Sequence, residues 1–408
     1  MNINTKNSII ISIGDELVSG QIDNSNSVYL ANILEKNGIK NTRIITIPDR
    51  EKPLVDSLDK ALGVDYVFIT GGLGPTHDDR TKNIVTDYFD TELVEVDELT
   101  QDLEEYFKER DINMSPNNYD QALIPRDGEI IPNEIGTASG MHFKKNQTQF
   151  FFLPGVPAEM KRMTENYIIT QLTDSSQSTF SQKIRTFGIP ESKLAQQLQD
   201  WIQEYEEIKL SFLPQLPGVD IFVKSQNKKL FEKTINHITD RFKNSIFGFD
   251  TIAPAEKLAE VLNKKNWTIS VAESCTGGRI GNKITNVPGS SSYFVGGIIA
   301  YANQIKKNFL DVDSKTLKKY GAVSSETAEQ MSEGIKDSFG TEVGLSTTGI
   351  AGPAGGSKRK PLGTVFIGIS TPNKTKVEKY IYNKNRLTNK KAFTKSALLK
   401  LIKTIQNE

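Results

Sequence analysis

The sequence has few of the residues that build disulfide frameworks, metal sites and histidine-dependent catalysis. Its 408 residues include one cysteine and three histidines. No apolar run approaches the roughly 20 residues that span a membrane. A single cysteine excludes a disulfide framework and is typical of a reducing compartment, so we expect a cytoplasmic location. The opening residues 1–7 are polar, so no signal peptide is expected.

Net charge is also absent, because 50 basic side chains balance 50 acidic ones, but the two signs are unevenly placed. Residues 1–250 carry 26 basic and 38 acidic side chains, whereas residues 251–408 carry 24 and 12. A basic domain suits a phosphorylated substrate and an acidic one suits a divalent cation, although solvated surface charge explains the same imbalance. No dense basic run is interleaved with aromatic residues, so nucleic-acid binding is not expected.

The length and the pattern of apolar runs predict an α/β protein with three domains. Residues 1–172 alternate strands with helices, which indicates a parallel α/β domain. Residues 173–250 begin with a polar linker and predict a small α+β domain without evident chemistry. Residues 251–408 return to alternating strands and helices, so a second α/β domain is expected there.

The segment Ala272-Glu-Ser-Cys-Thr-Gly-Gly278 lies between an apolar strand and a predicted helix. Ser274 is therefore predicted on a strand-to-helix turn at the carboxyl edge of the sheet, where open α/β sheets bind ligands. Small residues let a substrate approach the backbone, and free amides at the helix start can hold a negative charge. The alternative is an ordinary tight turn with a capping serine.

Two nucleophiles compete within this turn, Ser274 and Cys275. A thiolate nucleophile usually needs a partner that lowers its pKa, most often histidine, and all three histidines precede residue 250. A serine mechanism after residue 250 must therefore use lysine or tyrosine as its base. Cys275 is interpreted as a small buried residue.

A glycine-rich loop follows the third predicted strand and ends in two aspartates. Its backbone amides can wrap a phosphate, although glycines after strands are common. Carboxylates beside a phosphate loop suit Mg²⁺ or a similar ion, and helix capping is their alternative role. The residues concerned are Gly71, Gly72, Gly74, Asp78 and Asp79, with Asp15 and Glu16 after the first strand.

Several motifs occur in a characteristic order along the chain: Gly14-Asp-Glu16, Gly71–Asp79, Phe152–Pro157, Ala272–Gly278, Tyr301-Ala-Asn303, Gly321–Ser324 and Thr348–Pro353. Together they resemble the CinA (competence/damage-inducible protein) family over essentially the whole chain. Residues 1–172 are similar to its molybdopterin-binding-like domain, and residues 251–408 to its nicotinamide mononucleotide amidohydrolase domain. Asn24 and Asn385 replace aspartates of the family pattern, which places their local hydrogen bonds in question.

The resemblance implies that residues 251–408 hydrolyse the carboxamide of nicotinamide mononucleotide to nicotinate mononucleotide and ammonia, without a cofactor. Ser274 would be the nucleophile and a neutral Lys306 the leading base, with Tyr301 relaying the proton or orienting the lysine. Without the resemblance, Tyr301 is more simply interpreted as a core tyrosine and Lys306 as a surface lysine. The amides of Thr276, Gly277 and Gly278 would hold the oxyanion, and Thr348, Gly349 and Arg386 the nucleotide phosphate.

The resemblance also implies that residues 1–172 can cleave ADP-ribose with a divalent metal held by Asp15, Glu16, Asp78 and Asp79. The expected partners are these small nucleotides and a second copy of the chain, with no membrane. Two rival functions are a non-enzymatic scaffold in DNA uptake or repair, and a molybdopterin adenylyltransferase.

Overall fold

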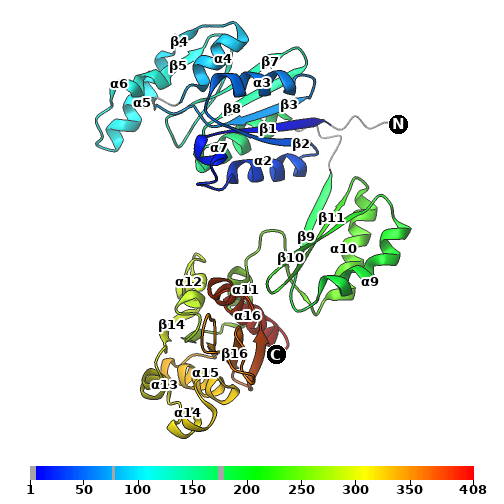
Figure 1. The fold of residues 1–408 in the computed structure, drawn as a ribbon, viewed down its shortest axis with the longest axis vertical. Coiled ribbons are helices and arrows are strands. Elements are labelled where there is room, and N and C mark those ends of the chain that lie inside the picture. The colour runs from blue at the N-terminus through cyan, green and yellow to red at the C-terminus, as the bar shows by residue number, and fades with distance from the viewer. Residues whose placement is uncertain (1–5, 76–78, 173–178) are drawn as a thin grey trace. The chain divides into compact units, whose positions relative to one another are not determined.

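A computed structural model describes residues 6–75, 79–172 and 179–408, which form two compact units, Met1–Phe180 and Ser181–Glu408 (Figure 1). The predicted α/β class is confirmed. The polar linker predicted at 173–179 lies mostly outside the described residues. In the described part of the chain, no helix is long and apolar enough to cross a membrane.

The first unit is built on a six-stranded sheet with the order β2-β1-β3-β8-β7-β6. The first four strands in this order are parallel, as predicted. Strand β7 runs antiparallel to both β8 and β6, and neither β6 nor β7 was predicted, because β6 has three residues and β7 begins at a glycine. The strands are β1 (Asn7–Ile13), β2 (Lys40–Ile47), β3 (Tyr66–Thr70), β6 (Glu129–Ile131), β7 (Gly140–Lys145) and β8 (Thr148–Leu153).

Helices cover both faces of this sheet, since a buried parallel sheet needs apolar cover on each side. On one face Leu30 of α2 (Ser25–Lys36) and Met160 of α7 (Pro157–Met163) are buried against the sheet. On the other face Leu54 of α3 (Glu51–Ala61) and Ile84 of α4 (Thr81–Phe89) are buried. The smaller elements are α1 (Asp15–Val18), β4 (Leu93–Glu95), α5 (Asp97–Glu109), α6 (Pro116–Tyr119), β5 (Leu123–Pro125) and α8 (Ile169–Leu172).

The second unit begins with a four-stranded sheet in the order β10-β11-β9-β12, which two helices pack against. This confirms the small α+β fold, although β10 was not predicted. Pro214 lies within that strand, and a proline within a run of residues argues against predicting that run as a strand. The elements are β9 (Phe180–Thr186), α9 (Glu191–Glu204), β10 (Lys209–Gln215), β11 (Gly218–Ser225), α10 (Lys228–Phe242) and β12 (Ile246–Phe249).

The second unit continues into a five-stranded sheet with the order β14-β13-β15-β16-β17. Strands β14, β13 and β15 are parallel, whereas β16 and β17 are antiparallel additions. The strands are β13 (Ile269–Glu273), β14 (Phe294–Ile299), β15 (Val343–Gly349), β16 (Thr364–Ser370) and β17 (Thr375–Ile381). The helices are α11 (Pro254–Lys265), α12 (Arg279–Thr285), α13 (Asn303–Leu310), α14 (Ser314–Tyr320), α15 (Ser325–Phe339) and α16 (Arg386–Gln406).

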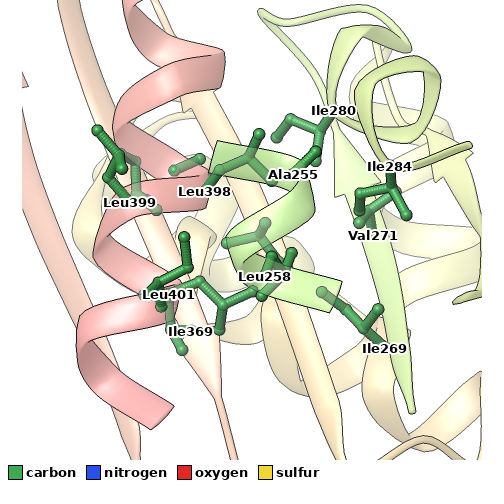
Figure 2. Packing of buried hydrophobic residues seen from close by; sticks show 14 of the residues in the cluster. Ala255, Leu258, Ile269, Val271, Ile280, Ile284, Ile369, Leu398, Leu399 and Leu401 are labelled. Atoms are coloured by element: carbon green, nitrogen blue, oxygen red, sulfur yellow. The ribbon is translucent and has the colours of Figure 1, made fainter. Parts of the chain in front are cut away.

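The core of this sheet fixes the chain on both sides of residue 274. Figure 2 shows Leu258 of α11 and Leu398 of α16 close to the strands, with Ile280 of α12 packed near them. Ile269 and Val271 of β13 are in the same buried cluster. Burying one such side chain contributes about 1.5–3 kcal/mol. The strand before the turn and the helix after it are therefore both anchored, which holds the turn between them in one conformation.

Candidate active site

The carboxyl ends of β13, β14 and β15 lie together at one edge of the five-stranded sheet. Strand β14 pairs with one side of β13 and β15 with the other, so the strand order reverses at β13. Ligands of open α/β sheets bind at such reversal points. Ser274 directly follows β13, and Thr348 and Gly349 end β15.

A cavity of 190 Å³ opens at this edge. Segments from five parts of the chain build it, after β13, after β14, between α14 and α15, at the end of β15 and at the start of α16. Two basic side chains and no carboxylate line it. Its lining residues are Ser274, Cys275, Tyr301, Lys306, Ala322, Val323, Thr348, Gly349, Ala351 and Arg386.

Lys306 is the only charged side chain among the largest fully buried ones in the described chain, with 1% of its surface exposed. Its Nζ lies 3.2 Å from Ser274 Oγ, so the predicted nucleophile and base are in contact. The same Nζ donates to the backbone carbonyls of Ala300, at 2.6 Å, and Tyr301, at 3.2 Å. These carbonyls become available because β14 ends at Ile299 and the chain turns into α13.

This environment suits both protonation states of Lys306. Burial lowers the pKa of Lys306 from 10.5 to about 8. The two carbonyls can only accept hydrogen bonds. A neutral amine can donate its two N–H groups to them, which leaves its lone pair to accept a hydrogen bond from the Ser274 hydroxyl. The protonated lysine has three N–H donors for the same three oxygens. The amine can therefore take up and return a proton without moving.

The turn itself is held by a residue that the sequence analysis missed, Glu273. Its buried carboxylate accepts hydrogen bonds from the amides of Ile280, at 3.1 Å, and Gly281, at 2.8 Å. Two of the amides at the start of α12 are therefore already bound and are not available to a ligand. The amides of Thr276, Gly277 and Gly278, which were expected to hold the oxyanion, have no hydrogen-bond acceptor among the described residues, so that role stays a prediction.

Tyr301 does not orient Lys306 through its hydroxyl. That hydroxyl accepts a hydrogen bond from Arg386 Nη2 at 3.2 Å, and the residue is 64% exposed. Only the backbone carbonyl of Tyr301 contacts the lysine. Arg386 is also held by the carbonyl of Gly352, at 2.6 Å from Nη1. The Thr348 hydroxyl donates to the carbonyl of Ala322 at 2.6 Å, so its proton is not available to a ligand.

Cys275 lines the cavity with 5% of its surface exposed, which confirms the predicted burial. Burial raises the pKa of the Cys275 thiol to about 12, so the thiolate does not form near neutral pH. We expect the Cys275→Ala variant to keep its activity within about threefold of wild type. Iodoacetamide at pH 8 should leave the wild-type turnover unchanged. Rapid inactivation by one equivalent of the reagent would instead identify the thiol as the nucleophile.

The candidate residues of the first unit that the structure describes lie at the carboxyl edge of its sheet. Gly71 follows β3 with φ +115°, and a side chain there would meet the carbonyl oxygen of Ile13. The carboxylate of Asp79 lies against Gly74, and that of Asp49 lies near Gly72. Asp15 and Glu16 are in the first turn of α1, and Asp78 lies outside the described residues. Within the described ranges, no three acidic, histidine or cysteine side chains gather as a metal site.

Comparison with known proteins covers nearly the whole chain. Three family models match it, CinA C-terminal domain over residues 252–405, Probable molybdopterin binding domain over 9–174, and Damage-inducible protein CinA KH domain over 181–248. A CinA-like protein of Dictyoglomus thermophilum is 38% identical, over 88% of this chain and 90% of its own. A CinA-like protein of Cytophaga hutchinsonii is 37% identical, over 90% of each chain.

The chain belongs to the CinA family. Among solved structures, the competence/damage inducible protein CihA from Agrobacterium tumefaciens is 33% identical over 38% of this chain and 97% of its own, with a TM-score of 0.36.

The segment that matches the CinA KH domain lacks the sequence pattern of the loop by which KH domains clamp nucleic acid. That loop has the pattern Gly-x-x-Gly. The glycines between residues 181 and 248 are Gly188, Gly218 and Gly248, so the pattern does not occur.

Two of the departures from the CinA pattern, at Asn24 and Asn385, keep their local hydrogen bonds. Asn24 Oδ1 accepts from the amide of Ser27 at 3.1 Å and caps α2. Asn385 Oδ1 accepts from the amide of Thr388 at 2.9 Å and caps α16. Asparagine is as good an N-cap as aspartate, so both helices begin where an aspartate would start them. Arg386 therefore remains at the rim of the cavity.

Proposed function

We propose that residues 251–408 hydrolyse the carboxamide of nicotinamide mononucleotide, giving nicotinate mononucleotide and ammonia. The observation that carries this proposal is the contact between Ser274 and a buried Lys306 in a cavity lined without carboxylates. A serine beside a neutral amine is an acyl-transfer pair. The absence of acidic side chains from the lining, together with Arg386 at the rim, favours a substrate that carries a phosphate.

In the first step Lys306 takes the proton of the Ser274 hydroxyl, and Oγ attacks the carboxamide carbon. The carbonyl oxygen becomes an oxyanion beside the turn, where the amides of Thr276 and Gly277 are free to donate. Lys306 is now an ammonium, and its third proton points back to the reacting centre.

In the second step that proton passes to the amide nitrogen, the carbon–nitrogen bond breaks, and ammonia leaves. An ester to Ser274 remains. Water then attacks the ester while neutral Lys306 takes one proton from it. Lys306 returns this proton to Ser274 Oγ as the ester bond breaks, and the carboxylic acid that is released loses its own proton to the solvent. Arg386 would hold the phosphate throughout, by two N–H donors of one guanidinium.

The proposal is tested by incubating the full-length protein with nicotinamide mononucleotide and measuring nicotinate mononucleotide and ammonia. Equal amounts of both products are expected, with or without a chelator, because the proposed groups are all supplied by the chain. A scaffold protein would produce neither. Ammonia release that a chelator abolishes and added metal restores would contradict the mechanism.

The rate should depend on the protonation of Lys306. With a pKa of about 8, roughly a tenth of the lysines are neutral at pH 7, and only that form can act as the base. We therefore expect kcat/KM to rise with pH and to level off above a midpoint near 8, because kcat/KM reports the free enzyme. The Tyr301→Phe variant should keep the same midpoint, since its hydroxyl does not contact the amine. A flat profile from pH 6 to 9 would exclude Lys306 as the base.

We further propose that the first unit cleaves the pyrophosphate of ADP-ribose. The supporting observation is the placement of the Asp79 carboxylate against Gly74 at the edge where a phosphate would contact the loop. The Asp79→Ala variant should lose cleavage of ADP-ribose and keep ammonia release. The predicted need for a divalent metal is measured by the same assay with a chelator. Cleavage that survives Asp79→Ala would remove this aspartate from the site.

A further inference from the structure

A cavity of 630 Å³ lies in the first unit between α5 and the loop at 132–139. None of the glycines or carboxylates assigned above to phosphate chemistry lines it. Its residues all belong to the unit Met1–Phe180, so its walls come from one compact body.

One wall of this cavity is a row of carboxylates along α5. Glu98, Asp102, Glu105 and Glu109 follow one another at spacings of four, three and four residues, which places them on one face of the helix. Like charges at these spacings weaken a helix. The lining also includes Leu99 and Leu103, so apolar surface alternates with charge along the wall.

The basic side chain of the lining does not neutralise this row. The guanidinium carbon of Arg110 lies 3.7 Å from the centroid of the Tyr106 ring, and its Nη1 donates to the carbonyl of Tyr106 at 3.0 Å. Its approach to Glu109, at 3.7 Å, is long for an ion pair. Glu98, Asp102 and Glu105 therefore line the cavity without an ion-pair partner among the described residues.

The second observation is a buried carboxamide. Gln121 lines the cavity with 2% of its surface exposed, and neither Nε2 nor Oε1 has a hydrogen-bond partner in the described structure. Its backbone is fixed, because Lys82 Nζ donates to the carbonyls of Asp120, Gln121 and Leu123 at 3.0–3.2 Å. A buried carboxamide without partners is costly, so its retention points to a ligand that satisfies it.

The wall opposite α5 is also preformed. Asn133 Nδ2 donates to the carbonyl of Ala138 at 3.0 Å and to Glu159 at 2.8 Å. Its Oδ1 accepts from the amide of Gly136 at 3.0 Å. These bonds hold the loop at 132–139 in one shape, so the cavity does not need to be ordered by its ligand.

We propose that this cavity binds a linear polyamine. The nitrogens of such a molecule are separated by three or four methylenes, which is about one helical turn, ~5.4 Å, and matches the spacing of the carboxylates on α5. Its methylene segments would contact Leu99 and Leu103, and Gln121 Oε1 would accept from an ammonium. A phosphate-bearing ligand is repelled by the same row.

The test is calorimetric titration of the full-length protein with spermidine, at constant ionic strength. Wild type should bind spermidine, and putrescine, with one charge fewer, should bind at least about tenfold more weakly. Glu105→Gln should weaken spermidine binding about tenfold. The matched control is Glu104→Gln, which removes an equal charge from an exposed position of α5 outside the cavity, and it should stay within about twofold.

Gln121→Leu gives an independent test, because this substitution should change stability and spermidine binding in opposite directions. Replacing an unsatisfied carboxamide by an apolar side chain should raise the melting temperature while it weakens spermidine binding. Three outcomes would each overturn the proposal. They are equal losses of spermidine affinity in Glu104→Gln and Glu105→Gln, displacement of spermidine by magnesium at matched ionic strength, and the absence of any heat of binding. A lysine-rich peptide that binds more tightly than spermidine would assign the cavity to a protein partner instead.

Discussion

Replacing Ser274 by alanine should abolish ammonia release, with a loss of at least about a thousandfold in kcat. The substitution removes the attacking oxygen, and no other hydroxyl lies within contact of Lys306 Nζ among the described residues. The Cys275 thiol cannot substitute, because its pKa of about 12 keeps it protonated. The measurement is nicotinate mononucleotide formed per mole of enzyme at pH 8.

The fold should survive this change, since Ser274 contributes a small hydroxyl and its turn is held by the Glu273 carboxylate and the core. The melting temperature of Ser274→Ala should therefore stay within a few degrees of wild type. Ser291→Ala, at an exposed position outside the cavity, is the matched control and should be fully active. Turnover near the wild-type rate in folded Ser274→Ala protein would exclude Ser274 as the nucleophile.

The second large effect is expected at Lys306. Methionine has a similar length but cannot take a proton, so Lys306→Met should lose at least about a thousandfold in kcat. Arginine keeps donors for the carbonyls of Ala300 and Tyr301 but stays charged at every accessible pH, so Lys306→Arg should be equally inactive. Lys307→Met, the neighbouring exposed lysine of α13, is the control and should be active.

A rescue experiment separates the base from a structural lysine. Lys306→Ala leaves a buried space lined by two carbonyls, and small primary amines added to the solution should restore part of the turnover. The restored rate should increase with the concentration of the neutral amine. Nicotinate mononucleotide is the product to follow, because added amine interferes with ammonia detection. A variant that unfolds, or activity in Lys306→Met, would contradict the assigned role.

The turn at Ser274 could be predicted because strand, small residues and helix are contiguous in the sequence. The burial of Lys306 could not, since α13 carries polar residues at most positions and its sequence is typical of an exposed helix. What buries the lysine is the end of β14, where Ala300 and Tyr301 turn their carbonyls toward Nζ. That geometry depends on how β14 pairs with β13, which residue patterns do not specify.

Elements without a clear apolar period were missed for a related reason. Helix α14 has Leu317 as its one aliphatic residue among lysines, so periodicity gives no signal there. The antiparallel direction of β16 is also invisible in its sequence, because a strand buried along its length looks the same in either orientation. Glu273 was overlooked because a carboxylate inside a strand usually indicates exposure, and only the fold shows the two amides that it binds.

The size of the cavity at Ser274 has a consequence for inhibitor chemistry. Its 190 Å³ is below the roughly 300–1,000 Å³ of pockets that enclose drug-sized molecules. Arg386 is exposed at its rim, while Lys306 is buried inside it. A selective inhibitor should therefore have a small flat head with an electrophilic carbon for Ser274 Oγ, and an anionic tail that stays outside on Arg386. Enlarging the head would cost affinity, whereas varying the tail would tune selectivity.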